Sequence, residues 1–282
     1  MQAIDVHTHV LPWSMLKPVV DVLKKRSMDL QSSEHIAEDP SKLLQAVDDA
    51  NVERTCVIGY TSPEVMGLTE SVNDFTIDYC AKYPGRLLPF GSPGVNQPEK
   101  AVKDSMNRLI DRGIRGIKIH PCHQLVYPHE YKTGGSRALE VIFSIAQAEH
   151  LPVMIHTGTS IFPRSINRFA DLIYVDDVAE DFPQLKIILA HGGRPIWMST
   201  AFFLVRRHEN VFLDISGIPP RSLLEYFPRV AEIAEKTMFG SDWPGPDVRS
   251  IKSNIADILS LPLSGAAKRL ILRETASKVL GA

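Results

Sequence analysis

The sequence lacks the features of an exported or membrane-embedded protein. It has only three cysteines, Cys56, Cys80 and Cys122, which are odd in number and form no C-x-x-C pair. Reduced thiols in a cytoplasmic protein explain them better than a disulfide framework does. No apolar run approaches the ~18 residues of a membrane span, and residues 1–9 have no signal-peptide pattern. We therefore expect a cytoplasmic protein with no membrane partner.

The sequence also lacks an excess of charge of either sign. Its 31 Lys and Arg residues nearly balance 33 Asp and Glu residues, so the net charge is −2. A nucleic-acid partner is not expected, because phosphate neutralisation needs a basic surface. With 282 residues and 44% hydrophobic residues, the chain has the length and composition of one globular domain over residues 1–282.

Eight short apolar or β-branched runs alternate with segments of helical period along the whole chain. This alternation predicts parallel strands with crossover helices, and eight repeats favour closure into a single-domain (β/α)8 TIM barrel. An open doubly wound sheet is the alternative, but no glycine-rich phosphate-binding motif follows any run. The predicted strands cover residues 3–9, 55–59, 87–91, 114–120, 152–156, 186–191, 211–216 and 237–242.

Three further segments carry predictions of their own. Residues 10–38 are long enough for a partly helical lid insertion after the first strand, and residues 263–282 have the pattern of a C-terminal amphipathic helix. Trp197 and the apolar run 201–205 suit either core packing, which we favour, or a homodimer interface.

Polar residues gather at the ends of the predicted strands. The C-terminal ends of barrel strands form the face that carries the active site, so these residues are the candidates for chemistry. Five of the ten histidines are among them. The set consists of His7, His9, Lys118, His120, His156, His191, Asp214, Ser216 and Asp242.

The spacing of His7 and His9 indicates a metal site. Alternate side chains of a strand point to the same face, so both imidazoles can reach one cation. An isolated H-x-H pair is a weak signal, and surface histidines are its plain alternative. Together with His156, His191 and Asp242, however, the pair would leave several buried polar groups unsatisfied unless a cation binds them. The sequence therefore predicts a divalent metal ion at the strand ends.

The motifs around these residues resemble those of the amidohydrolase superfamily. The resemblance is strongest to its amidohydrolase-related branch, which includes aminocarboxymuconate-semialdehyde decarboxylase. The matching motifs occur in family order between residues 5 and 244. They are Asp5-Val-His7-Thr-His9, Gly116-Ile-Lys118-Ile-His120-Pro121, Ile155-His156-Thr157-Gly158, Ala190-His191-Gly192-Gly193 and Phe239-Gly240-Ser241-Asp242-Trp243-Pro244.

The resemblance implies a role for each matched position. It implies that Zn²⁺, or Mn²⁺ in its place, is held by four ligands, His7, His9, His156 and Asp242. It also implies that Asp242 acts as general base on the attacking water and that His191 assists it or binds a second ion.

Lys118 leaves two alternatives open. In some members a carboxylated lysine at this position bridges two ions, whereas an unmodified ammonium would pair with a carboxylate or an anionic substrate. We favour the ammonium and therefore one ion. His120 is expected to contact the substrate or a metal ligand, and Asp214 and Ser216 are expected to support the ligands.

The function predicted from these residues is a metal-dependent hydrolase. It would cleave an ester, lactone or amide bond of a small, carboxylated substrate. Arg164, Arg194 and Trp243 are its predicted substrate contacts, since a guanidinium binds a carboxylate through two parallel hydrogen bonds. The alternatives are a metal-dependent decarboxylase of a small carboxylated or aromatic acid and a catalytically silent metal-binding barrel.

Overall fold

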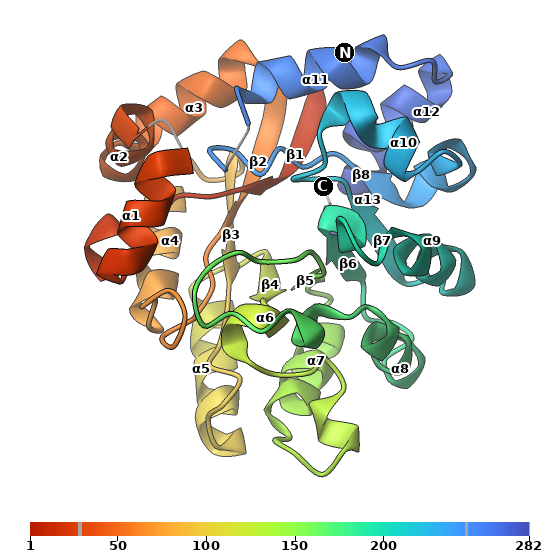
Figure 1. Cartoon of the computed structure of the whole chain (residues 1–282). Helices are drawn as coiled ribbons and strands as arrows, with labels where there is room; N and C mark the ends of the chain where they lie inside the picture. The colour runs from red at the N-terminus through yellow and green to blue at the C-terminus, as the bar shows by residue number, and fades with distance from the viewer. Residues whose placement is uncertain (28–29, 246–247, 282) are drawn as a thin grey trace.

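The computed structural model describes residues 1–27, 30–245 and 248–281, and it confirms the predicted barrel. Eight strands form one sheet in the order β1 to β8, and every neighbouring pair is parallel. Figure 1 shows the strands at the centre with helices around them. The strands are β1 (Ala3–Thr8), β2 (Val52–Ile58), β3 (Leu87–Gly91), β4 (Gly116–Ile119), β5 (Val153–His156), β6 (Ile187–Ala190), β7 (Val211–Asp214) and β8 (Thr237–Met238).

Hydrogen bonds beyond β8 close the barrel onto β1. The backbone N–H of Val6 donates to Phe239 at 3.0 Å, and that of Asp242 donates to His7 at 2.8 Å. Thr8 and Trp243 form a further parallel bridge. This closure places the segment that carries Asp242 directly beside the strand that carries His7.

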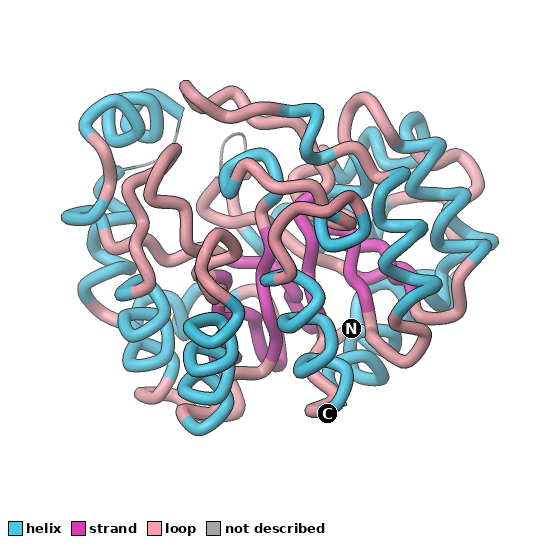
Figure 2. Tube along the Cα trace, turned by 90° about the horizontal axis from the view of Figure 1, so that it is seen from below, coloured by secondary structure: helices cyan, strands magenta, loops and turns pink. Residues whose placement is uncertain are grey.

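The helices surround the strands, as the tube view in Figure 2 shows from another side. Among the described residues, none of the helices has both the length and the apolar character that a membrane span requires. The helices are α1 (Pro18–Ser27), α2 (Leu30–Glu38), α3 (Pro40–Asp49), α4 (Ser71–Cys80), α5 (Glu99–Asp111), α6 (Pro121–Gln124), α7 (Ala138–Ala148), α8 (Ile173–Asp181), α9 (Met198–Arg207), α10 (Leu223–Tyr226), α11 (Ile251–Ser260), α12 (Gly265–Arg269) and α13 (Thr275–Leu280).

The segments predicted to lie outside the strand–helix alternation are helical. Residues 10–38 contain a 3-10 turn at Trp13–Met15 followed by α1 and α2, while residues 28–29 lie outside the described chain. Residues 263–281 contain α12, a π-helical stretch at Leu270–Glu274 and α13, and residue 282 is not described. The lid role of the first segment stays a prediction. In α9, Ala201, Leu204 and Val205 are buried, as core packing requires, and the homodimer stays a prediction.

Two apolar clusters support the strand ends. The larger one packs helices against the barrel, with buried residues such as Leu43, Val102 and Ile142. The second cluster includes Met154 and Phe212, which precede His156 and Asp214 by two residues. Since side chains alternate along a strand, these residues share the interior face with the polar strand ends. The polar residues therefore project from an apolar floor.

Phe90 of β3 tests the contribution of this floor to stability. Its side chain is fully buried, and a Cβ at Gly116 of β4 would lie only 2.3 Å from its ring. We expect Phe90→Ala to lower the free energy of unfolding by about 3–5 kcal/mol, because it leaves a cavity. Phe203→Ala is the matched control, because Phe203 is 50% exposed, and a change within about 0.5 kcal/mol is expected. Equal losses for both variants in urea unfolding would contradict this assignment.

Candidate metal centre

Two histidines of the first strand and one aspartate after the last strand meet at one point. The Nε2 atoms of His7 and His9 lie 3.2 Å apart. Oδ1 of Asp242 lies 3.8 Å from Nε2 of His7 and 3.3 Å from Nε2 of His9. Closure of β8 onto β1 brings these atoms together from opposite ends of the chain.

Hydrogen bonds fix the protonation of both imidazoles. Nδ1 of His7 lies 2.7 Å from Oδ2 of Asp214, and Nδ1 of His9 lies 3.1 Å from the carbonyl oxygen of Ile58. A carbonyl accepts only, as does an ionised carboxylate, so each Nδ1 carries the proton and each Nε2 presents a lone pair. Burial also holds the pKa of His7 well below its ordinary value, which keeps its ring neutral.

The three donor atoms fit a divalent cation. Ligands of a tetrahedral zinc ion at about 2.0–2.1 Å lie roughly 3.3–3.4 Å from one another. The separations of 3.2, 3.3 and 3.8 Å between His7, His9 and Asp242 span that value. Two lone pairs and a carboxylate that face each other repel unless a cation lies between them. The donor set therefore has the chemistry of a metal site.

His156 and His191 present nitrogens to the same pocket. Nε2 of His156 donates to the carbonyl of Gly158 at 2.8 Å, so its Nδ1 is the nitrogen free to bind a metal. His156 is not part of the group of three whose donors lie within 4.8 Å. Nδ1 of His191 lies 3.1 Å from the carbonyl of Ser216, so its Nε2 is unprotonated. Burial lowers the pKa of His191 to about 3, which keeps it neutral.

Strained backbone conformations hold two of these residues in place. His191 has φ = 67° and Asp242 has φ = 60°, both in the left-handed region that side chains disfavour. Such conformations cost on the order of 1–3 kcal/mol and persist where surrounding contacts impose them, often at functional sites. Gly192 follows with φ = 53°, where an added Cβ would lie 2.9 Å from Leu213.

Lys118 and Asp5 are buried ionisable groups with unsatisfied atoms. Nζ of Lys118 and Oδ2 of Asp5 have no hydrogen-bond partner in the described chain. Burial lowers the pKa of Lys118 to about 8, against the opposing charges of Asp214 and Asp242. Burial raises the pKa of Asp5 to about 7, although N–H groups of Ser241 and His7 stabilise its carboxylate. Lys118 faces the pocket and is available to a ligand there.

The pocket has a volume of about 280 Å³ and collects most of the predicted site residues. Its lining includes Lys118, His120, His156, His191, Arg194 and Asp242. Nε of Arg194 is buried without a partner, which leaves it able to bind substrate. Arg164 and Trp243 lie outside the lining. Arg164 is exposed and pairs with Glu64 at 3.4 Å, whereas Trp243 packs against the larger apolar cluster. Their substrate contacts stay predictions.

Several residues that line the pocket were not predicted from the sequence, and the polar side chains Tyr60, His123 and Ser160 are among them. Tyr60 lies two residues beyond β2 on the face of Ile58, so the alternation of the strand could have indicated it. His123 lies in α6 and Ser160 in the loop after β5, where no periodic pattern marks a residue that faces the pocket.

A second group of possible donors is a poor metal site. The donor atoms of His120, Cys122 and His123 lie within 4.8 Å of one another. The rings of His120 and His123 are stacked 3.7 Å apart at 10°, so their in-plane lone pairs run nearly parallel rather than converge. Nδ1 of His123 contacts Tyr60 and Nε2 contacts Ser160, so both nitrogens are already engaged.

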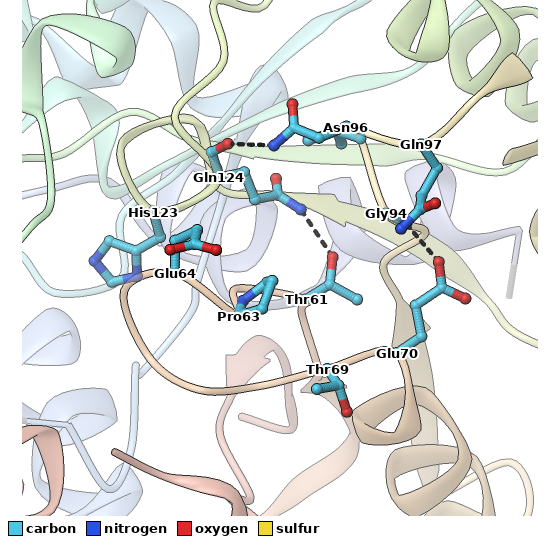
Figure 3. Close-up of a pocket in the computed structure, with 11 residues that line it drawn as sticks. Thr61, Pro63, Glu64, Thr69, Glu70, Gly94, Asn96, Gln97, His123 and Gln124 are labelled. Atoms are coloured by element: carbon cyan, nitrogen blue, oxygen red, sulfur yellow. Dashed lines mark hydrogen bonds between the residues drawn. The ribbon is translucent and has the colours of Figure 1, made fainter. Parts of the chain in front are cut away.

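A second cavity of about 280 Å³ lies on the other side of His123. Figure 3 shows His123 at one end and Glu70 at the other. Gln124 donates to Thr61 at 3.1 Å between them, and Asn96 donates to the carbonyl of Gln124 at 3.1 Å. His123 lines both cavities and therefore forms part of the wall between them.

Asp214→Asn tests whether a fixed proton position is needed for metal binding. Oδ1 of Asp214 accepts a hydrogen bond from the backbone N–H of Ser216, and Oδ2 accepts one from Nδ1 of His7. In asparagine one of these oxygens becomes an NH₂ group, so in either orientation of the amide a donor faces another donor. We expect zinc affinity, measured by competition with a chelator, to fall about 10–100-fold. Asp176→Asn disrupts another Asp–His pair, with His208 at 2.7 Å, and should leave the affinity unchanged. Unchanged affinity in Asp214→Asn would contradict the role of this hydrogen bond.

Lys118→Met tests the burial of the lysine charge in the metal-free protein. The folded-state pKa of about 8 lies below 10.5, so the unfolded state binds more protons between these pH values. The variant should be more stable than wild type at pH 7, by an amount of order 3 kcal/mol, and the gap should close as the pH rises toward 10.5.

Lys100→Met is the control for this pH dependence, because the Lys100 side chain is 90% exposed. It should show no comparable gap in urea unfolding at any of these pH values. If the difference in unfolding free energy between Lys118→Met and wild type stays constant from pH 7 to 10.5, the buried amine does not titrate as described.

Comparison with known families gives a match over nearly the whole chain. A family model described as Amidohydrolase matches residues 4–282. No curated protein matches the chain.

Solved structures share the fold at low sequence identity. An uncharacterized TIM-barrel protein from Bordetella bronchiseptica has a TM-score of 0.80 at 20% identity, covering 100% of this chain and 99% of that one. A probable 2-pyrone-4,6-dicarboxylic acid hydrolase from Acinetobacter baumannii has a TM-score of 0.68 at 14% identity, covering 100% of both. A 5-carboxyvanillate decarboxylase from Novosphingobium aromaticivorans, with bound manganese, has a TM-score of 0.69 at 16% identity, covering 100% and 97%.

Proposed function

Because the chain belongs to the amidohydrolase family, we propose that it is a metal-dependent hydrolase. Its substrate would be a small carboxylated ester, lactone or amide. The observation that carries the proposal is the convergence of two unprotonated imidazole nitrogens and a carboxylate, from His7, His9 and Asp242, at the mouth of the barrel. A probable 2-pyrone-4,6-dicarboxylic acid hydrolase with the same fold supports it.

Nε2 of His7, Nε2 of His9 and Oδ1 of Asp242 would hold the cation, and Nδ1 of His156 would complete the set. Zinc suits this mixture of imidazole and carboxylate ligands, and manganese is the alternative that a neighbouring structure contains. A bound cation supplies a Lewis acid for the substrate carbonyl and makes water a stronger nucleophile at neutral pH.

Asp242 would accept the proton of the attacking water, and His191 would orient that water. Burial alone would raise the pKa of Asp242, but the surrounding polar groups hold it well below the ordinary value, so it is a carboxylate. Its carboxylate would accept the proton and return it to the leaving group. His191 presents an unprotonated Nε2 to the pocket and would orient the water as a hydrogen-bond acceptor.

Lys118 and Arg194 would bind the carboxylate of the substrate. Both line the pocket, and each has a buried nitrogen without a hydrogen-bond partner in the described chain. His120, stacked 3.8 Å from His156, would contact the substrate beside the metal. Carboxylation of Lys118 would instead create an anionic bridge for a second ion. We favour the unmodified lysine and one ion, since an ammonium offers a partner for a carboxylated substrate.

Decarboxylation is the second candidate. Solved structures of the same fold include 5-carboxyvanillate and 2,6-dihydroxybenzoate decarboxylases. In that case Lys118 and Arg194 would hold the carboxylate that leaves, and the same ligands would bind the cation.

Product analysis distinguishes the two reactions. Zinc- or manganese-loaded protein is incubated with a panel of small lactones and esters and with carboxylated aromatic acids. We expect ring opening or ester cleavage, without release of carbon dioxide, and at least ~100-fold loss of activity in His7→Ala and in His156→Ala. Metal-ligand losses of this order follow from removal of the group that supplies Lewis acidity.

The matched control is His150→Asn. His150 is exposed and has φ = 56°, a conformation that asparagine tolerates, so the change should leave activity and metal content as in wild type. Release of carbon dioxide in a stoichiometric amount would contradict the hydrolase assignment and support decarboxylation instead. Turnover that survives both ligand substitutions would falsify the metal mechanism.

A further inference from the structure

A chain of hydrogen bonds runs from Tyr60 through His123 to Ser160 in the wall of the metal pocket. The hydroxyl of Tyr60 lies 3.1 Å from Nδ1 of His123, and Nε2 of His123 lies 2.7 Å from Oγ of Ser160. Tyr60 and His123 are 5% and 2% exposed. All three residues line the pocket that His9, His156 and Asp242 also line.

The direction of this chain follows from the buried phenol. His123 is the one hydrogen-bond partner of the Tyr60 hydroxyl within the described chain. If Nδ1 of His123 donated to that hydroxyl, the phenol proton would be buried without an acceptor, which is costly. Tyr60 therefore donates to Nδ1, so His123 carries its own proton on Nε2 and donates it to Ser160.

Ser160 is left with one unused proton. Its Oγ accepts from Nε2 of His123 at 2.7 Å and from the backbone N–H of Phe162 at 3.2 Å. These two bonds occupy both lone pairs of a hydroxyl oxygen, so the remaining capacity of Ser160 is its O–H donor. The described chain offers that proton no acceptor, and Ser160 borders the pocket.

The surrounding contacts hold Ser160 in position. Its backbone N–H donates to Oδ1 of Asn167 at 2.7 Å, and Nδ2 of Asn167 donates back to its carbonyl at 3.1 Å. The ring of His123 is fixed by stacking on His120, 3.7 Å away. The hydroxyl is therefore oriented before a ligand arrives, and preorganised donors bind more tightly than mobile ones.

We propose that Ser160 is a substrate-binding residue whose hydroxyl donates a hydrogen bond to a carboxylate or carbonyl oxygen of the substrate. Tyr60 and His123 are positioning residues that fix the direction of this donor. The proposal rests on the proposed function, since it places the substrate in the same pocket as the metal. Because His123 also lines the second cavity, substitutions at its two partners test the proposal more cleanly (Figure 3).

The first test measures the tautomer of His123 and needs neither metal nor substrate. Nitrogen-15 NMR of the histidine-labelled, metal-free protein reports which ring nitrogen carries the proton, and His123→Asn identifies the signal. We expect the proton on Nε2 in wild type and a loss of this preference in Tyr60→Phe. A proton on Nδ1 in wild type would overturn the proposal, because Ser160 would then donate to His123.

The second test measures binding of carboxylate probes to the zinc-loaded protein by calorimetry. The probes are acetate and the dicarboxylates from malonate to adipate, whose second carboxylate can reach beyond the metal. We expect Ser160→Ala to weaken the tightest dicarboxylate about tenfold, the loss typical of a hydrogen bond to a charged group. Acetate binding should stay within about twofold of wild type, the scale of a minor contact. Ser160→Thr keeps the hydroxyl and should retain most of the affinity.

Ser260→Ala is the matched control, because Oγ of Ser260 in α11 donates to the carbonyl of Asp257 at 2.7 Å, and Ser260 does not line the pocket. It should leave dicarboxylate affinity near wild type. If dicarboxylates bind and Ser160→Ala has no effect, the role of Ser160 is wrong while the metal pocket stands. If no carboxylate probe binds the zinc-loaded protein, both the role of Ser160 and the proposed function are contradicted.

Discussion

The Nδ1 protons of His7 and His9 are each held by an oxygen that accepts, the carboxylate of Asp214 and the carbonyl of Ile58. The two Nε2 lone pairs consequently face each other across 3.2 Å, with Asp242 beside them. These groups repel one another unless a cation lies between them, so the arrangement favours a bound cation. The arrangement depends on barrel closure, which brings β8 against β1. It also depends on β7, which places the carboxylate of Asp214 within hydrogen-bond distance of His7. The same principle, an imidazole tautomer set by its partner, orients His156, His191 and His123.

The architecture and the gathering of polar strand ends could be predicted from the sequence. Eight buried runs alternate with helices, and parallel strands place their C-terminal ends on one face of a barrel. The period of two along a strand was sufficient to set His7 and His9 on the same side. The C-terminal boundary of the last strand was predicted less accurately. The expected run 237–242 is a strand only over Thr237–Met238. Asp242, at the end of that run, adopts a left-handed φ that is foreign to a strand.

Contacts between distant segments account for what the sequence did not reveal. The sequence predicted that Asp214 supports the ligands, but it did not identify His7 as the partner, because the two residues lie 207 positions apart and no local pattern pairs them. Loop conformations decide that Ser160 faces the pocket while Arg164 pairs with Glu64 outside it. A periodic pattern carries no information on such loops, and residue type alone favoured the arginine. The walls of the pocket thus required coordinates, whereas the strand pattern was sufficient to bring His7, His9 and Asp242 to one place. Their role as metal ligands stays a prediction.

X-ray absorption and anomalous diffraction at the zinc edge of the zinc-loaded protein test the central claim most directly. We expect an ion bound by Nε2 of His7 and Nε2 of His9, each at about 2.0–2.1 Å, with a carboxylate oxygen of Asp242 as a further ligand and no sulfur neighbour. An ion with a sulfur ligand at about 2.3 Å, bound by Cys122 among the second group of donors, would contradict it.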